Sequence, residues 1–305
     1  QKSCRNITSE AISYFINPSY PASDQTVQVC DYRIDIPSTR QGKSLDGETT
    51  TSRICQVRLD FEEFTLPEPE TVAPNIGQCL RSKMMLTGSA GVTYRVAQFC
   101  GVLTGQHMYL EINPDLEDST YFSLMAIIGV ENPSDPVPQY SWKIKITQIN
   151  CATENYLRAP AGCLQYFYGQ RGNVESLNSR GTGGYFRSLD YDICLRTELN
   201  ACAVEWKADA FDIVGSQTPG ANGDAVCQQD YLIIPQVILD TGENKDRFCS
   251  SVLSNVTGTT PTETAVYMPI NGPIAIRFRS NADNLNGQGF RLTFRQLVPS
   301  ETDLC

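Results

Sequence analysis

Histidine is almost missing from this chain, which has only His107 among its 305 residues. Triad-type nucleophilic catalysis needs a histidine beside an activated nucleophile and an orienting carboxylate. No Gly-x-Ser-x-Gly segment or similar nucleophile setting accompanies His107. It precedes a strand-like run, so we interpret it as a loop or strand-edge residue. The sequence therefore predicts no catalytic residue and no enzymatic activity.

Long apolar runs and basic side chains are also scarce. No run of about 18 apolar residues occurs, which is the length a membrane-spanning helix needs. Lys and Arg number 24 against 34 Asp and Glu, so the formal net charge is −10. Binding to a nucleic-acid backbone needs clustered cations. We therefore expect neither a membrane span nor a nucleic-acid partner.

Cysteine, in contrast, is abundant, with 12 in the chain. Zinc sites need close ligand pairs or nearby histidines, whereas the closest cysteines here are Cys194 and Cys202. An even number of widely spaced cysteines is typical of disulfides formed in an oxidising compartment. The chain starts at Gln1, which we interpret as a mature N-terminus left by signal cleavage. The sequence thus predicts a secreted, extracellular, disulfide-bonded protein without cofactor or metal.

Short apolar-polar alternations dominate the chain, and helical periodicity is rare. Such period-2 runs, separated by Gly, Pro and Asn, are typical of an all-β sandwich. The expected strands include Met108–Ile112, Phe122–Ile128, Trp142–Ile146, Tyr231–Ile234, Ile274–Phe278 and Phe290–Phe294. The expected surface loops are Pro37–Arg53, Pro67–Pro74 and Asn132–Pro138.

The cysteines form two sets of six, which indicates an internal repeat. The first set is Cys4, Cys30, Cys55, Cys79, Cys100 and Cys151, and the second is Cys163, Cys194, Cys202, Cys227, Cys249 and Cys305. The alternating runs after Cys55 and Cys202 align, and a phenylalanine, Phe64 or Phe211, follows each of these cysteines by nine residues. We predict domains over 1–151 and 163–305, joined by a short linker over 152–162 that restricts their relative motion.

Several motifs, in this order and repeated, resemble the CUB family. An early "SPNYP"-like turn, a hydrophobic strand, a Cys-Gly element, a C-x-x-D-Y strand and a terminal "F-x-S-D … G-F" element are recognisable. The matching segments are Tyr14–Pro21, Val57–Leu66, Phe99–Gly101, Cys227–Ile234, Phe278–Asn281 and Gly289–Phe290. Three further segments resemble secreted tandem CUB proteins of arthropods: Ile54–Phe61, Gly105–Tyr109 and Cys163–Tyr166. The resemblance implies two CUB-like antiparallel, jelly-roll-like β-sandwich domains.

The resemblance also implies two disulfides in each domain. These are Cys4–Cys30, Cys79–Cys100, Cys163–Cys194 and Cys227–Cys249. The repeat then pairs the remaining cysteines within each domain as Cys55–Cys151 and Cys202–Cys305, a departure from the usual CUB pattern. The alternative, Cys55–Cys202 with Cys151–Cys305, would join the two domains and stays open.

Many CUB domains bind calcium through three acidic positions, and this chain matches them poorly. Calcium needs several hard oxygen ligands at one place. Pro67 and Ser82 replace two of the acidic residues in the first domain. The second domain keeps Asp230, has Val214 in place of the Glu, and has Asn281 in place of the terminal Asp, with Asp283 nearby. We expect at most a calcium remnant there, and interpret Asp230 as a buried or loop-capping carboxylate.

With no catalytic constellation, the CUB resemblance favours a non-catalytic extracellular protein-binding module. One alternative is a structural protein that assembles from copies of itself, and another is the regulatory segment of a larger secreted protease. Cys305 completes the second cysteine set, which favours a finished chain over the protease segment. Sequons at Asn6 and Asn255 predict a glycoprotein. In Tyr166–Tyr168, an exposed tyrosine could anchor a partner, but we favour the simpler interpretation that these aromatics belong to the core and to ordinary surface.

Overall fold

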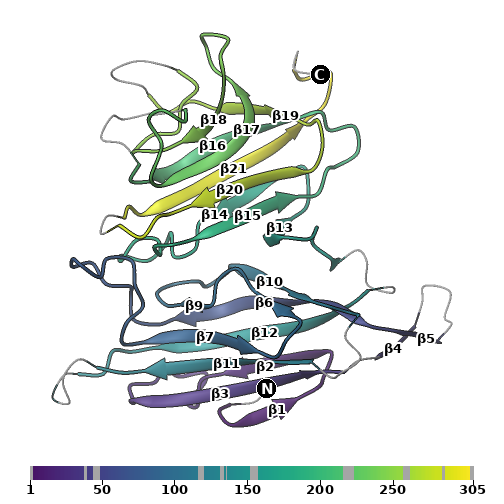
Figure 1. Ribbon diagram of the computed structural model, residues 1–305, viewed down its shortest axis with the longest axis vertical. Helices are drawn as coiled ribbons and strands as arrows, with labels where there is room; N and C mark the ends of the chain where they lie inside the picture. Colours follow the sequence, from purple (N-terminus) through teal and green to yellow (C-terminus); the bar gives the residue numbers. More distant parts are fainter. Residues whose placement is uncertain are drawn as a thin grey trace. The chain divides into compact units, whose positions relative to one another are not determined.

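Figure 1 shows a computed structural model of the chain. The structure describes residues 3–37, 40–43, 49–115, 120–130, 134, 136–151, 157–215, 223–256, 262–283 and 286–302. Within these ranges the secondary structure is β-strand without any α-helix, and no helix is long and apolar enough to cross a membrane. The all-β fold class predicted from the alternating pattern is confirmed.

The chain divides into two compact units. The N-terminal unit comprises Gln1–Pro69 and Cys79–Leu164, and the C-terminal unit comprises Glu70–Gln78 and Gln165–Cys305. The domain limits at 151 and 163 stay predictions from the cysteine sets. The segment Glu70–Gln78, which lies early in the sequence, groups with the C-terminal unit.

The N-terminal unit is built from two five-stranded sheets. The first has the order β1-β3-β11-β7-β9, formed by Asn6–Thr8, Gln28–Ile36, Thr120–Ile128, Lys83–Gly88 and Gln98–Phe99. The second has the order β2-β12-β6-β10-β8, formed by Ile12–Ile16, Ser141–Asn150, Ile54–Thr65, His107–Ile112 and Val92–Thr93. The described pairings in these two sheets are antiparallel, as expected, except at one edge, where β1 pairs with β3 in parallel.

An aromatic core fills the N-terminal unit because alternate residues of its strands point inward. Phe15 stacks on Tyr32 with ring centroids 5.3 Å apart and contacts Trp142 at 5.4 Å. Phe61, Phe64 and Phe99 form a second cluster with centroids 5.3 to 5.4 Å apart. Fully burying side chains of this size contributes roughly 1.5–3 kcal/mol each.

A short hairpin corrects one loop expected from the sequence. Pro37–Arg53 was predicted as a surface loop, but β4 (Arg40–Lys43) and β5 (Thr49–Ser52) pair there as antiparallel strands. Proline and glycine near this segment suggested a loop, whereas the threonine run at 49–51 has high β propensity. Pairing between the two segments outweighed the turn-forming residues. The other two expected loops contain no strand in their described residues.

The C-terminal unit repeats the strand order of the N-terminal unit. Its first sheet has the order β13-β15-β20-β17-β18, formed by Cys163–Phe167, Asp190–Leu195, Ile274–Arg279, Tyr231–Ile238 and Asn244–Phe248. Its second sheet has the order β14-β21-β16-β19, formed by Arg171–Glu175, Gly289–Leu297, Ala203–Asp212 and Val266–Pro269. Phe278 lies in the core, where its ring centroid is 5.2 Å from Tyr185 and 5.5 Å from Phe290.

A β-bulge occurs at the same place in both units. In β6 the register with β12 shifts between Phe61 and Glu63, and in β16 the register with β21 shifts between Ala208 and Ala210. The extra residue, Glu62 or Asp209, follows Cys55 or Cys202 by seven residues in each case. Bulges are retained within related folds rather than placed at random. The matching bulge is thus a structural counterpart of the cysteine repeat.

Disulfides join the strands of each unit. The structure contains Cys4–Cys30, Cys55–Cys151, Cys79–Cys100 and Cys227–Cys249, which are four of the six pairs expected. Cys163, Cys194 and Cys202 are also disulfide-bonded. β13 and β15, which carry Cys163 and Cys194, are neighbours in one sheet, in keeping with the pair still predicted between them. Cys305, the expected partner of Cys202, lies outside the described residues.

Candidate functional site

Asp230, the first residue of the expected calcium remnant, is a buried hydrogen-bond acceptor. It precedes β17 and is 2% exposed. Its Oδ2 accepts a 2.6 Å hydrogen bond from the Tyr185 hydroxyl, and its Oδ1 accepts one of 2.7 Å from the Asn281 N–H. Asp230 therefore ties the segment before β15 to the end of β20. The burial and hydrogen bonding expected of this residue are observed, and its structural role stays a prediction.

Burial is the largest influence on the pKa values of Asp230 and Tyr185. Desolvation raises the pKa of Asp230, and the Asp283 carboxylate raises it further, against the hydrogen bonds from Tyr185 and Asn281, which lower it. Desolvation and the neighbouring Asp230 also raise the pKa of the Tyr185 phenol, which stays neutral and donates its proton. The phenol oxygen accepts the Val214 N–H at 3.1 Å. Val214, Tyr185 and Asp230 thus form a chain of hydrogen bonds in which each donor meets an acceptor.

These residues do not fit a calcium ion. Asn281 presents its main-chain N–H to Asp230, and Val214, at the position where a Glu was expected, contributes an N–H donor to the cluster. Asp283 is exposed, and its carboxylate accepts the side-chain amide of Asn281 at 2.7 Å. Calcium takes about 6–8 oxygen ligands. Among the described residues no group of three or more His, Cys, Asp or Glu side chains gathers as a metal site.

The equivalent position in the N-terminal unit performs the same bracing without a charge. Ser82 follows Cys79 by three residues, as Asp230 follows Cys227, and it is 4% exposed. Its hydroxyl donates to the Gly129 carbonyl at 3.2 Å and accepts the Gly129 N–H at 3.3 Å. A hydroxyl can do both, while a carboxylate only accepts. This position therefore links strand ends in both units whichever side chain occupies it.

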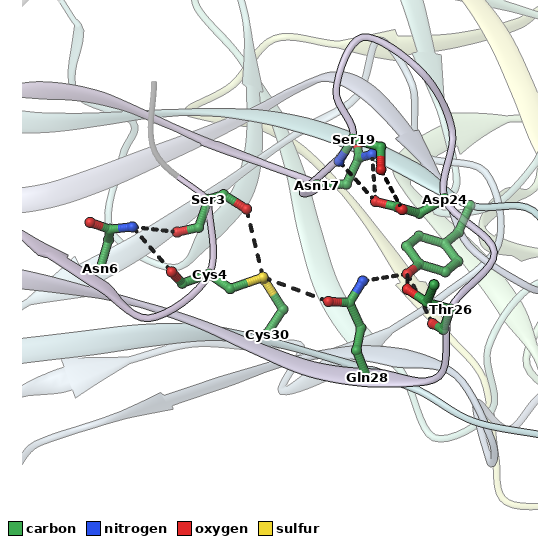
Figure 2. The surroundings of a disulfide bond; sticks show 10 residues. Ser3, Cys4, Asn6, Asn17, Ser19, Asp24, Thr26, Gln28 and Cys30 are labelled. Atoms are coloured by element: carbon green, nitrogen blue, oxygen red, sulfur yellow. Dashed lines mark hydrogen bonds between the residues drawn. A yellow bond between two sulfur atoms is a disulfide. The ribbon is translucent and has the colours of Figure 1, made fainter.

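The "SPNYP"-like turn of the N-terminal unit is organised around a second buried carboxylate. Figure 2 shows Asn17 and Ser19 converging on Asp24, close to the Cys4–Cys30 disulfide. Asp24 accepts the Ser19 hydroxyl at 2.6 Å, the Ser19 N–H at 3.0 Å and the Asn17 amide at 3.1 Å. Burial raises the pKa of Asp24, but these three hydrogen bonds outweigh it and hold the pKa below its ordinary value. The Asp24 carboxylate therefore serves to hold the conformation of this turn.

His107 is buried next to a tyrosine that contacts the end of the predicted linker. It starts β10, is 5% exposed, and lies edge-on to Tyr109 with ring centroids 5.7 Å apart. The Tyr109 hydroxyl donates to the Leu157 carbonyl at 3.1 Å. Gln56, 1% exposed, donates to the Ala159 carbonyl and accepts the Ala159 N–H, both at 2.9 Å. The end of the predicted linker is thus held on the outer face of a sheet.

The sequence-predicted tyrosine cluster includes one strongly exposed member. Tyr168, just after β13, is 63% exposed, and the Arg196 guanidinium lies 5.5 Å from its ring centroid. In a turn closed by a 3.1 Å hydrogen bond from the Ala201 N–H to the Glu198 carbonyl, Leu199 is 84% exposed. We call Tyr168, Arg196 and Leu199 the loop platform. Sequence reasoning singled out the cluster Tyr166–Tyr168 without saying which tyrosine is exposed. It missed Leu199, although an apolar residue next to Asn200 in a turn could have indicated it.

The two loops of this platform are tied together beneath their exposed side chains. The Glu198 carboxylate accepts the Gly169 N–H at 2.8 Å and pairs with Arg196 at 2.8 Å. Gln296, 4% exposed, donates to the Gly169 and Arg196 carbonyls and accepts the Glu198 N–H at 2.9 Å. The Gly169 hydrogen bond, and after it Arg196, hold the pKa of Glu198 below its ordinary value.

The two sequons differ in the hydrogen bonds of the asparagine side-chain amide, and both asparagines are half-buried. Asn6 lies in β1, and its amide nitrogen donates to the Ser3 and Cys4 carbonyls at 3.0 and 3.1 Å. Asn255 lies in a loop, where its side-chain carbonyl accepts the Thr264 hydroxyl at 2.6 Å. Its sequon threonine, Thr257, lies outside the described residues. Glycosylation at both positions stays a prediction.

Two of the solved structures similar to this chain consist of CUB and EGF domains. The CUB1-EGF-CUB2 domains of rat MASP-1 are 14% identical over 95% of this chain and 100% of that chain, with a TM-score of 0.32. The CUB1-EGF-CUB2 domain of human MASP-1/3 is 13% identical over 94% and 100%, with a TM-score of 0.29. The full extracellular region of zebrafish Gpr126/Adgrg6 is 14% identical over 98% of this chain and 38% of that chain, with a TM-score of 0.31. No curated protein sequence matches the chain.

A family model supports the resemblance inferred from the motifs. Residues 160–297 match the model of the animal CUB domain. This range holds strands β13 to β21 of the C-terminal unit. The tandem arrangement and the arthropod type stay predictions. The C-terminal unit is therefore the part of the chain whose similarity to the animal CUB domain is established.

Proposed function

We propose that this chain is a non-catalytic, secreted protein-interaction protein made of two CUB-like units. The CUB match of residues 160–297 supports the class. The shared strand order and the matching bulges support a second, divergent CUB-like unit at the N-terminus. The buried disulfides are in keeping with an extracellular location.

The loop platform carries the proposal. Tyr and Arg are enriched among the residues that dominate binding energy at protein interfaces. Here Tyr168, Arg196 and Leu199 project from loops that Glu198 and Gln296 hold in one arrangement. Binding to such a surface orders few side chains, so less entropy is lost on association. We therefore assign partner recognition to the platform.

Affinity capture with wild-type and variant chains tests this assignment. The full chain is immobilised and exposed to the native extracellular fluid, in parallel with Tyr168→Ala, Leu199→Ala and the control Ile238→Ala. Ile238 is another exposed apolar residue of the C-terminal unit, at 44% exposure. For the purified captured partner, we expect each platform variant to weaken binding about tenfold, as for interface residues that contribute above about 1 kcal/mol.

Two results would contradict the proposal. A partner that binds all variants with the same dissociation constant would place recognition elsewhere on the chain. Turnover of a substrate by the purified chain, with no partner captured, would overturn the non-catalytic class itself.

A further inference from the structure

One edge strand of the N-terminal unit is apolar, regular and uncharged. β2 (Ile12–Ile16) is the outer strand of its sheet and pairs with β12 without a register shift. Ile12 is 54% exposed, and Tyr14 and Ile16 are half-buried. Sheet edges are usually protected from pairing with another chain by charge, proline, a bulge or short length. β2 has none of the first three, and it has five residues.

The other described edge strands of the four larger sheets are short, carry charges, end in proline or are largely buried. β1, β8 and β9 have two or three residues each. β14, which occupies the place of β2 in the C-terminal unit, has Arg171 and Glu175 at its ends. β18 contains Lys245 and Arg247, and β19 ends at Pro269. β13 is uncharged, but its first three residues are buried. Among the described edges of the four larger sheets β2 is therefore distinctive; β5 (Thr49–Ser52) is also uncharged, but it belongs to a separate two-stranded hairpin.

The free hydrogen-bonding groups of β2 can be assigned from its pairing. The Asn17 N–H donates to the Trp142 carbonyl at 3.1 Å, and the Gln148 N–H donates to the Ala11 carbonyl at 2.8 Å. In an antiparallel pair, residues that exchange hydrogen bonds alternate with residues that do not. The odd-numbered residues of this segment therefore bond to β12. The N–H and C=O groups of Ile12, Tyr14 and Ile16 point to the free edge.

The residues whose main-chain groups point to the free edge, Ile12, Tyr14 and Ile16, have the order Ile, Tyr, Ile in both chain directions. We propose that β2 pairs with β2 of a second copy of this chain, antiparallel about a two-fold axis at Tyr14. Tyr14 then lies opposite Tyr14, and Ile12 opposite Ile16, with about six main-chain hydrogen bonds. Aromatic and β-branched cross-strand pairs of this kind are favourable. An isologous contact of this type closes on itself as a dimer.

The neighbouring charges permit this pairing. Lys143 and Lys145 lie on β12 opposite Ile16 and Tyr14. Lys143 is paired with Glu62 at 2.6 Å. Across the two-fold axis the two copies of β12 would be three strand spacings apart, about 14 Å. The two backbones are thus farther apart than the Debye length of about 8 Å at physiological salt. The Lys143 ammonium lies nearer the axis, 5.4 Å from the Tyr14 ring centroid, and its Glu62 partner offsets its charge.

Sedimentation equilibrium of the full chain, from micromolar to near-millimolar concentration, tests the proposal. Because one five-residue edge is a small contact, we expect a concentration-dependent monomer–dimer equilibrium. Tyr14→Lys places like charges opposite each other at the axis and should raise the dimer dissociation constant at least tenfold. Tyr14→Pro removes only an N–H that β12 does not use, and should act in the same direction. Circular dichroism and thermal unfolding establish that each variant is folded.

Matched variants separate this contact from others. Ile238→Lys, at an exposed isoleucine of the C-terminal unit, should leave the dimer unchanged. Tyr168→Ala should also leave it unchanged, since the dimer does not depend on the loop platform. A wild-type chain that stays monomeric at all concentrations would overturn the proposal. So would a folded Tyr14→Lys variant that dimerises with the wild-type dissociation constant.

Discussion

At the scale of single residues, two buried aspartates have opposite electrostatic consequences. Three hydrogen bonds hold the pKa of Asp24 below its ordinary value despite burial. Asp230 accepts hydrogen bonds from Tyr185 and Asn281, but its burial and the nearby Asp283 raise its pKa. A lowered pKa in the folded state stabilises the fold above the ordinary value of the group, and a raised one destabilises it there. For Asp24 the hydrogen bonds outweigh burial, whereas for Asp230 burial, together with the Asp283 carboxylate, outweighs the hydrogen bonds.

Replacing Asp230 should reveal whether its ionisation stabilises or destabilises the fold. Because its folded pKa is raised, the native state binds the proton more tightly than the unfolded chain. Its contribution to stability is therefore most favourable below the unfolded pKa of 3.8 and is lost as pH rises through the folded pKa. We expect wild type to gain stability relative to Asp230→Asn as the pH falls from 7 towards 4. Thermal unfolding of both proteins across this range measures the difference. A difference that shrinks on acidification would contradict the assignment.

At the scale of elements, the side chains of Gln56 and Tyr109 join the end of the linker to the sheet. The side-chain amide of Gln56 in β6 donates a hydrogen bond to the Ala159 carbonyl and accepts one from the Ala159 N–H, as the main chain of a neighbouring strand would. The sequence predicted a short linker with restricted motion, but nothing in its composition pointed to Gln56. The partners are about a hundred residues apart in the chain, so only folding brings them together.

Gln56→Ala should loosen this attachment. It leaves the N–H and C=O of Ala159 without partners, which costs about 1–3 kcal/mol when such groups stay buried. We expect urea unfolding to show a loss of this size, together with faster proteolytic cleavage between 152 and 162. Gln98→Ala, at an exposed position of β9, is the control and should change neither quantity. Unchanged stability and cleavage in Gln56→Ala would show that the linker is held by other contacts.

At the scale of the whole molecule, two units share a strand order but differ at the position that resembles a calcium ligand. Ser82 and Asp230 both brace strand ends through main-chain groups of the facing strand. A shared structural role explains why the fold tolerates both side chains.

The whole chain should therefore unfold independently of calcium. A ligand that binds only the native state stabilises it by about 2.7 kcal/mol at a hundred times its dissociation constant. For this chain, we expect the melting temperature in millimolar calcium to equal that in a chelator. Differential scanning calorimetry of wild type and Asp230→Asn in both buffers is the measurement. A calcium-dependent increase that Asp230→Asn abolishes would establish a metal site at Asp230.

The sequence by itself determined the all-β class, most strands and the division of cysteines into two sets, because alternation and cysteine spacing are local properties of the chain. It also predicted the burial and hydrogen bonding of Asp230. Only the tertiary structure decided the parallel pairing of β1, the β4–β5 hairpin, the Gln56 attachment and the exposure of Leu199. Each of these depends on which distant segments pack together. The apolar alternation of Ile12–Ile16 predicts a strand, but its place at an uncharged sheet edge follows from the order of all five strands.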